Sequence, residues 1–181
     1  MRAVVCSERG PASKLKVTDF PDPQPGPDDA VIDVMAAGCN FPDALIIEGK
    51  YQVRPELPVV PGIEAAGVVS AIGENVTGLA IGQRVITLDS TQCGAFAEKL
   101  AATAQTLLPM PDEMGFSTGA GFGLTYGTSY YALKQRAELQ AGETLLVLGA
   151  AGGVGLAAVE LGCAMGARVI AAASSAKKLD A

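Results

Sequence analysis

The chain has 181 residues, of which 49% are hydrophobic and 18% are charged, so it can form a packed core and is not a disordered tail. Its formal net charge is −6 and it has no run of lysines or arginines, which argues against nucleic-acid binding. No uninterrupted stretch of about 18 apolar residues occurs, and the amino terminus lacks the apolar segment of a signal peptide. We therefore expect a cytoplasmic protein without a membrane span.

Cysteine and histidine usage restricts the chemistry that the chain can carry. The cysteines are far apart in the sequence and form no C-x-x-C pair, which disfavours a disulfide framework. The chain has no histidine, so the commonest general base and metal ligand is missing. We expect no metal site, and chemistry that comes from a cofactor or from carboxylates, hydroxyls, lysines and thiols. The four cysteines are Cys6, Cys39, Cys93 and Cys163.

The first two-thirds of the chain predicts short β-strands separated by turns, a pattern typical of a small barrel. The clearest alternation lies in 30–37, where Val31, Asp33 and Met35 share one face of a strand. Four prolines make 21–27 a loop. A short helix is expected over 41–48, with Asn40 as its cap. The expected strands are 3–6, 15–20, 30–37, 65–72, 84–88 and 95–100.

The pattern changes near Met114, where helical and buried-strand signals replace the short alternating strands. A helix is expected over 116–133 with Ser117 as its cap, and an apolar helix over 154–165 lies between apolar strands at 144–148 and 168–172. Strands that are apolar along their whole length around a helix are typical of a parallel β-α-β unit. We place a domain boundary near Gly123, inside the first helical stretch.

A G-x-x-G-x-x-G string joins the first apolar strand to its helix. Glycine allows a tight turn there, keeps side chains away from a pyrophosphate and permits close packing of the helix on the strand. The N–H groups at the start of the helix then face the anion. The alternative is a glycine-rich turn that only packs. The predicted cofactor-binding residues of this loop are Gly149, Ala150, Gly152, Gly153, Val154 and Gly155.

The end of the second apolar strand bears on which cofactor binds. Sites specific for NAD carry an acidic residue there that holds the ribose 2′-hydroxyl. This chain has no acid between Ile170 and Asp180, and instead offers Ser174, Lys177 and Lys178. A hydroxyl and an ammonium group suit a 2′-phosphate, which favours NADPH over NADH and makes Ser174 and Lys178 predicted contacts. The alternative is that the lysines only solvate a helix face.

Four long segments in one order point to a known family: 37–51 (AGCNFPDALIIEGKY), 57–85, 123–133 and 146–175. They resemble the zinc-independent, NADPH-dependent quinone oxidoreductases, the zeta-crystallin-like branch of the medium-chain dehydrogenase/reductase superfamily, and the resemblance extends over essentially the whole chain. The resemblance implies a mixed β and α/β fold. A GroES-like β-barrel domain over 1–122 would precede the start of an NADP-binding Rossmann domain over 123–181.

The same resemblance implies a site without zinc. Zinc-bearing relatives have a cysteine ligand and a histidine ligand where this chain has Asn40 and Ile63, and Cys39 lies one position away from the cysteine site. A site with neither thiolate nor imidazole cannot form a typical zinc centre. Glu64, which follows Ile63, is expected to be a structural partner for a backbone group. It is therefore not counted among the catalytic residues.

The resemblance also implies catalytic positions and an activity. Asn40 and Tyr51 would line the pocket that faces the nicotinamide and the substrate, and Thr125 would contact the nicotinamide. The implied reaction is hydride transfer from NADPH to a quinone or another conjugated carbonyl compound by a homodimeric enzyme. Reduction of an α,β-unsaturated thioester or ketone stays open, as does a nucleotide-binding module without turnover. Because the chain stops at Ala181, soon after its second apolar strand, a molecule ending there is expected to self-associate and to bind NADPH weakly.

Overall fold

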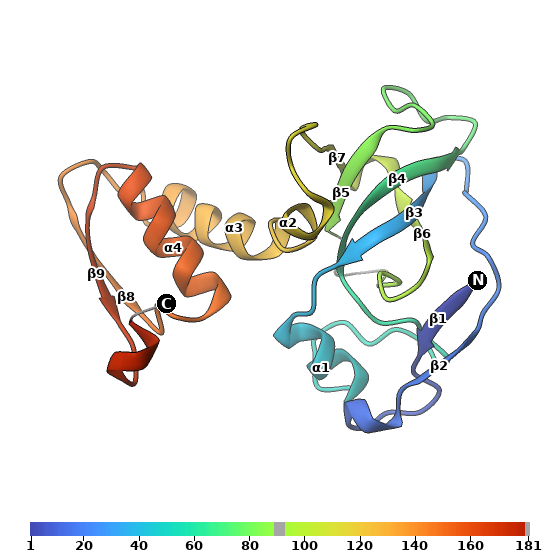
Figure 1. Cartoon of the computed structure of the whole chain (residues 1–181), viewed down its shortest axis with the longest axis horizontal. Coiled ribbons are helices and arrows are strands. Elements are labelled where there is room, and N and C mark those ends of the chain that lie inside the picture. The colour runs from blue at the N-terminus through green and yellow to red at the C-terminus, as the bar shows by residue number, and fades with distance from the viewer. Residues whose placement is uncertain (89–92, 180–181) are drawn as a thin grey trace. The chain divides into compact units, whose positions relative to one another are not determined.

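The computed structural model describes residues 1–88 and 93–179, and the chain divides into two compact units, Met1–Gly123 and Leu124–Ala181 (Figure 1). In the part of the chain that the structure describes, no helix combines the length and the apolar character that crossing a bilayer requires.

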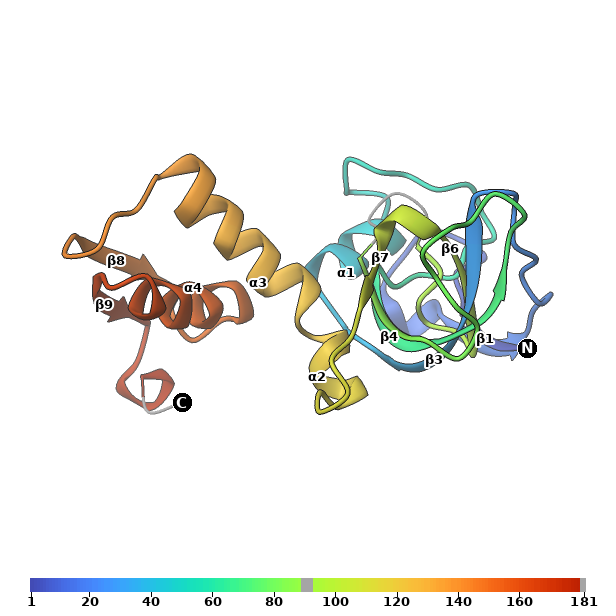
Figure 2. The same ribbon diagram turned by 90° about the horizontal axis from the view of Figure 1, so that it is seen from above.

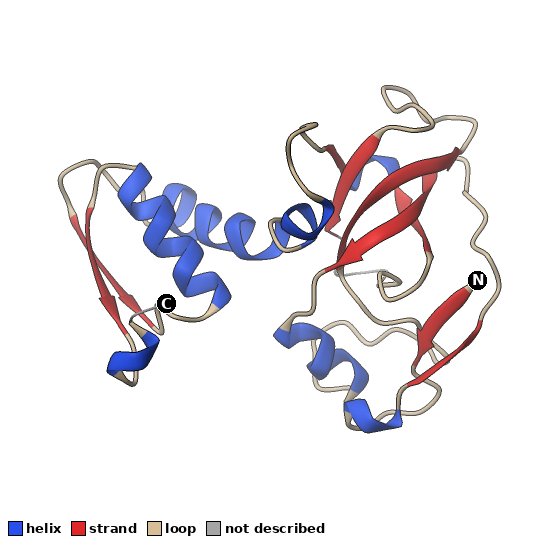
Figure 3. Cartoon of the chain, viewed as in Figure 1, coloured by secondary structure: helices blue, strands red, loops and turns tan. Residues whose placement is uncertain are grey.

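An antiparallel five-stranded sheet forms the centre of the first unit (Figure 3). Ile32, Val69, Val85 and Leu100 from four of its strands pack into one core cluster. The alternation predicted for 30–37 is confirmed from Ile32 onward, whereas Val31 is buried beside an irregularity of the strand pairing. In sheet order the strands are β6 (Lys99–Thr103), β3 (Asp29–Ala37), β4 (Glu64–Ile72), β5 (Arg84–Leu88) and β7 (Leu107–Pro109).

A second, two-stranded antiparallel sheet is formed by β1 (Arg2–Val5) and β2 (Lys16–Asp19), with a short 3₁₀ helix at Ala12–Lys14 between them. It connects to the rest of the unit through a bridge between Ala3 and Ala97, where the Val4 N–H donates to the Phe96 carbonyl at 2.8 Å. The sequence predicted both strands to within one residue at each end.

The helix α1 (Phe41–Ile47) starts at Asn40, as predicted. Asn40 has extended backbone angles, and its N–H donates to Oδ2 of Asp43 at 2.7 Å, so a side chain of the first turn holds the helix start. The helix is followed by Glu48 as its C-cap and then by Gly49, whose φ of 69° lies in the left-handed region that glycine favours.

Two expected elements of the first unit differ from the structure. The strand expected over 95–100 starts later, as β6 at Lys99. Of the residues expected before it, only Ala97 forms a β-bridge, and this bridge is isolated. The helix expected over 116–133 is broken into α2 (Phe116–Ala120), α3 (Gly123–Tyr130) and a π-helical turn at Tyr131–Arg136. Glycines around the break explain it, since each costs a helix about 1 kcal/mol relative to alanine. The cap expected at Ser117 is wrong, because the residue that precedes α2 is Gly115.

The second unit contains a parallel β-α-β arrangement, as predicted. The strands β8 (Thr144–Leu148) and β9 (Arg168–Ala172) pair in register from Thr144 opposite Arg168, and α4 (Gly153–Ala164) runs alongside them (Figure 2). A Cβ at Gly162 of α4 would stand 2.7 Å from Cδ2 of Leu145 and 3.0 Å from Cγ2 of Val169. Glycine at this position therefore lets the helix lie close to both strands without displacing these side chains.

Candidate functional site

The glycine loop between β8 and α4 is held against the end of β9. Gly149 adopts φ 71°, a left-handed conformation that glycine favours, and the N–H groups of Gly149 and Ala150 both donate to the carbonyl of Ala172, at 2.9 and 3.0 Å. The Gly152 N–H donates to the Gly149 carbonyl at 3.0 Å, and Gly152 then caps α4. The turn is therefore tight, and it brings the ends of the two strands together.

Gly155 lets the first turn of α4 pack directly on this loop. A Cβ at Gly155 would lie 2.3 Å from the carbonyl oxygen of Gly149 and 2.9 Å from Cα of Ala150. Both neighbours are backbone atoms, so no side-chain movement could relieve the clash. The role of Gly155 is thus close packing, which is the role given to the third glycine of dinucleotide-binding loops.

An open pocket of about 900 Å³ lies beside the loop, within the second unit. Four of the predicted cofactor-binding residues line it: Gly149, Gly152, Ser174 and Lys178. Ala150 is buried and does not line it, and Gly153, Val154 and Gly155 belong to the first turn of the helix behind it. The remaining lining residues are Leu148, Ala151, Ala172, Ala173, Ser175 and Lys177.

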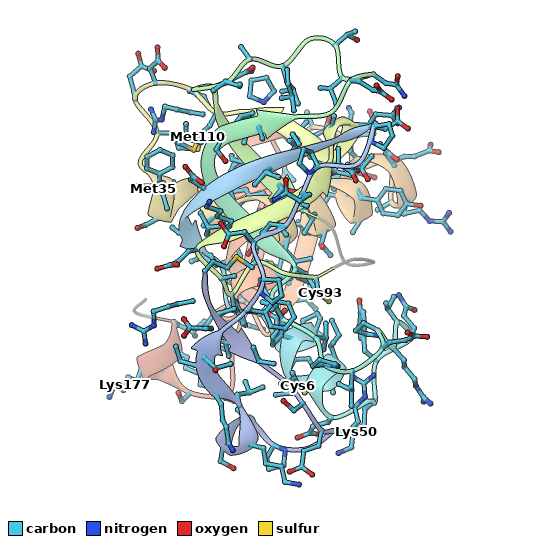
Figure 4. The ribbon with its side chains drawn as sticks, turned by 90° about the vertical axis from the view of Figure 1, so that its right-hand side faces the viewer. Cys6, Met35, Lys50, Cys93, Met110 and Lys177 are labelled. Atoms are coloured by element: carbon cyan, nitrogen blue, oxygen red, sulfur yellow. The ribbon has the colours of Figure 1, made fainter. Side chains whose placement is uncertain are left out.

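The polar side chains of this pocket are hydroxyls and ammonium groups. Lys178 Nζ donates to Oγ of Ser174 at 3.1 Å, and Lys177 extends exposed from the short helical turn after β9 (Figure 4). Among the described residues that line the pocket, none carries a carboxylate. The pocket is therefore electropositive and suits a ligand that combines an apolar body with anionic groups.

Thr125 lies in the second unit, close to the glycine loop. A Cβ at Gly153 would stand 3.1 Å from Cγ2 of Thr125, so α3 passes directly beside the start of α4. Ser129, one turn further along α3, donates its hydroxyl to the Val154 carbonyl at 2.7 Å. On the same helix, Tyr126 donates to a carboxylate oxygen of Glu160, and this hydrogen bond raises the pKa of Tyr126. The second unit thus brings Thr125 to the loop that sequence reasoning assigned to the cofactor.

Asn40 belongs to a cluster of polar groups in the first unit. Its Nδ2 donates to Oε1 of Glu64 at 2.8 Å, while its backbone N–H donates to Asp43. Both carboxylates are buried, with Asp43 4% and Glu64 1% exposed. Burial raises the pKa of Asp43, and the negative charge of Glu64 adds to the rise, although the backbone N–H of Asn40 opposes it.

The sequence reasoning overlooked part of this cluster. Asp43 was not proposed as a site residue, and the contact between the Glu64 carboxylate and the Asn40 side chain was not foreseen. An acidic residue three positions after a helix cap is the signal that could have singled out Asp43. No local pattern connects Asn40 with Glu64, which stands 24 positions away.

Tyr51 follows the end of α1 and is half-buried in the first unit. Gly49 reverses the chain just before it, and the Lys50 N–H donates to the Leu45 carbonyl at 2.8 Å. At the two zinc-ligand positions of zinc-bearing relatives, Asn40 is half-buried and Ile63 is 2% exposed, and Cys39, one position away, is exposed. Within 1–88 and 93–179, no group of three or more histidine, cysteine, aspartate or glutamate side chains is arranged to hold a metal ion.

The sequence of this chain was compared with protein families and with known proteins, and it is similar to members of one group. The family model of the alcohol dehydrogenase GroES-like domain matches residues 26–112. The quinone oxidoreductase-like protein 2 homolog of Nematostella vectensis is 41% identical over 178 residues, which are 97% of this chain and 48% of that protein. The quinone oxidoreductase of Pongo abelii is 40% identical over 97% of this chain and 53% of its own length.

A solved structure agrees over both units. The crystal structure of Escherichia coli quinone oxidoreductase complexed with NADPH matches with a TM-score of 0.93 and 31% identity, over 99% of this chain and 55% of that one. Over nearly its whole length the chain is similar to quinone oxidoreductases of the medium-chain dehydrogenase/reductase superfamily. It spans about half the length of the curated relatives that it matches.

The likeness to these proteins confirms the predicted fold class. The antiparallel sheet of the first unit belongs to a GroES-like domain, and β8, α4 and β9 are the first part of a Rossmann domain. The family resemblance read from the sequence is therefore correct for both parts of the chain.

Proposed function

We propose that this chain forms part of an NADPH-dependent oxidoreductase that transfers hydride to a quinone without zinc. The observation that carries the proposal is the pocket of the second unit, where a side-chain-poor glycine loop faces hydroxyls and lysines and no described lining residue is acidic. The Escherichia coli relative was solved in complex with NADPH, which supports the same cofactor.

The residues present fit NADPH at this pocket. The loop contributes only backbone and one methyl group, from Ala151, to the pocket wall, which leaves room for a pyrophosphate against the start of α4. Ser174 and Lys178, already joined by a hydrogen bond, would donate to a 2′-phosphate, and Lys177 would add positive charge. When bound, NADPH supplies the hydride, and these side chains bind and orient it.

The acceptor would be held by residues of the first unit. Asn40 carries donor and acceptor atoms on a half-buried side chain, and Tyr51 carries a hydroxyl, so both can hydrogen-bond the oxygen of a quinone. We propose Thr125, beside the glycine loop, as a contact of the nicotinamide. Quinones accept hydride readily, which suits a site without histidine. Faster turnover of an enoyl thioester than of 1,4-naphthoquinone would instead identify an enoyl reductase.

Three further properties belong to the proposal. The GroES-like domain would span 1–122 and the Rossmann part 123–181, the enzyme would be a cytoplasmic homodimer, and it would contain no zinc. Sedimentation of the purified protein tests the dimer, and cell fractionation tests the location. The zinc-free state rests on Asn40 and Ile63 in place of thiolate and imidazole. Stoichiometric zinc in elemental analysis, or activity lost to a chelator, would refute it.

The cofactor preference is tested by replacing Lys178 with glutamate. The change removes a donor and places a negative charge beside Ser174, so it should weaken NADPH binding by about 1–3 kcal/mol while affecting NADH much less. Fluorescence titration of both cofactors measures the two losses. Lys134→Glu makes the same charge change at an exposed position of the second unit outside the pocket, and should leave both affinities unchanged. Equal losses for NADPH and NADH in Lys178→Glu would contradict the proposal.

A further inference from the structure

The carboxylate of Glu64 sits in a space that two glycines keep open. Glu64 is the first residue of β4, pairs with Leu88 of β5 and is 1% exposed. A Cβ at Gly38 would stand 2.2 Å from its Oε1, and a Cβ at Gly123 would stand 3.5 Å from its Oε2. Backbone pairing and these close approaches fix where the two oxygens lie.

A buried carboxylate in a fixed place dictates how its neighbour is oriented. A carboxylate accepts hydrogen bonds, so the group of Asn40 that faces Oε1 at 2.8 Å has to be the Nδ2 donor and not the carbonyl. Turning the amide over would set two acceptors against each other in a buried place, which costs the desolvation of both. The charge-assisted bond therefore selects one of the two flipped states of the Asn40 side chain.

The backbone of Asn40 is held as well. Its N–H donates to Oδ2 of Asp43 at 2.7 Å, and Asp43 is itself buried. One carboxylate from α1 thus fixes the backbone of Asn40, and a second from β4 fixes its side chain. The half-buried amide keeps one further N–H and its Oδ1, and both can bind a ligand.

We infer that Glu64 is a positioning residue, which orients the Asn40 amide for the oxygen of the hydride acceptor. The inference rests on the proposed function for the identity of that acceptor. A partner that locks the rotamer of a contacting side chain sets how accurately the substrate is placed, and small misplacements lower rates strongly. Glu64 acts only through Asn40 and needs no contact with the substrate.

The orienting contact can be observed directly, because the chain has only two asparagines, Asn40 and Asn75. Labelling asparagine with ¹⁵N in the full chain gives two side-chain amide pairs in an NMR spectrum. Asn75 donates to Asp28 at 3.0 Å in an exposed pair and serves as the internal reference. The Asn40 amide should exchange its hydrogens more slowly than that of Asn75, and equally fast exchange of the two would overturn the inference.

Glu64→Gln keeps the size of the side chain and removes its charge. A glutamine can present either its oxygen or its nitrogen to Asn40, so the amide orientation is no longer imposed. The Asn40 resonances should shift and exchange faster, while those of Asn75 stay. Asp28→Ala is the matched control, which should shift Asn75 and leave Asn40 unchanged. Unchanged Asn40 resonances in a folded Glu64→Gln chain would overturn the inference. If that variant does not fold, the exchange comparison in the wild-type chain decides.

Kinetics separate positioning from a purely structural role. With NADPH and 1,4-naphthoquinone, Glu64→Gln should lower kcat by about tenfold or more and leave the KM for NADPH unchanged, because only the acceptor contact is misplaced. Unchanged kcat beside shifted Asn40 resonances would overturn the positioning role. In a wild-type chain without turnover, kinetics do not test the role of Glu64. Quinone binding then decides. Adding the quinone should shift the NMR resonances of the Asn40 side-chain amide in the wild type and not in Glu64→Gln, and any other result would overturn the inference.

Discussion

Asp22 is the centre of a small charge network at the amino terminus. Its Oδ2 accepts a hydrogen bond from Lys99 Nζ and its Oδ1 accepts one from the Met1 ammonium group, both at 2.7 Å. Lys99 and then the terminal ammonium lower the pKa of Asp22 from 3.8 to about 2. In return, Asp22 raises the pKa of Lys99. The network joins the loop after β2 to the first residue of β6 and to the chain terminus.

This pKa shift predicts a pH dependence with a defined sign. The folded pKa is depressed, so the contribution of Asp22 to stability is complete above the unfolded value of 3.8 and is lost as the pH falls towards about 2. Asp22→Asn should therefore flatten the fall in stability in this window. Asp43 acts with the opposite sign because its pKa is raised, so only the difference between variant and wild type is informative.

Urea unfolding of the two proteins at about pH 5 and about pH 2 measures this difference. The side chains of Asp22 and Lys99 are 43% and 40% exposed, so salt at about 1 M should reduce the effect by screening. Asp19→Asn, at an exposed position on β2, is the control and should retain the wild-type dependence. Identical pH dependence in Asp22→Asn and the wild type would show that the network does not stabilise the fold.

Two glycines in helices differ in the space around them, so replacing each with alanine should change stability in opposite directions. Gly155 in α4 lies against the backbone of the glycine loop, where an added Cβ would come within 2.3 Å of the Gly149 oxygen. Gly127 in α3 has no atom within 4 Å of an added Cβ. Gly155→Ala should destabilise the chain by about 1–3 kcal/mol through overpacking, and Gly127→Ala should stabilise it by about 0.4–1 kcal/mol through helix propensity and chain entropy.

Urea denaturation of the two alanine variants checks both signs in one experiment. Gly155→Ala should also weaken NADPH binding, because α4 must move away from the loop to accommodate the methyl group. Gly127→Ala should leave binding unchanged. A destabilised Gly127→Ala would show that α3 meets a constraint there that the surrounding space does not reveal, and a neutral Gly155→Ala would show that the loop relaxes freely.

Elements with a strong local pattern were predictable from the sequence. Apolar strands on either side of a glycine loop predicted β8, α4 and β9, and an asparagine before Phe41-Pro42 predicted α1. The short strand β7 was missed, because Leu107–Pro109 is too brief to show a period and forms only by pairing with β5. The contact of Asn40 with Glu64 depends on how β4 and α1 are brought together, which spacing alone does not show.

The two units of the molecule differ in how many apolar side chains they bury. The first unit has three clusters of buried apolar side chains around its sheets. In the second unit, the large side chains Leu146, Leu148 and Ile170 of β8 and β9 are 57%, 77% and 45% exposed. The buried apolar residues described for the second unit are Leu133, Leu139, Val147, Ala150 and Ala157.

This difference predicts unequal local stability along the chain. Opening a segment exposes the apolar surface that it buries, so regions with few buried contacts open at lower free energy. The amides of β3 and β4, at the centre of the five-stranded sheet, should therefore exchange hydrogen most slowly. Those of β8 and β9, which form a two-stranded sheet, should exchange faster. Hydrogen–deuterium exchange followed by mass spectrometry resolves these segments.

Addition of NADPH turns the same measurement into a test of where the cofactor acts. A ligand that binds only the folded form protects the segments that it stabilises, by about 2.7 kcal/mol at a hundredfold excess over its Kd. Protection should appear in the glycine loop, in the start of α4 and in 173–178, while β3 and β4 should be unchanged. Lys178→Glu should reduce it by about 1 kcal/mol or more at the same concentration, and Lys134→Glu should not. Equal exchange in β3 and β8 without cofactor would contradict unequal stability, and protection confined to the first unit would contradict the assigned pocket.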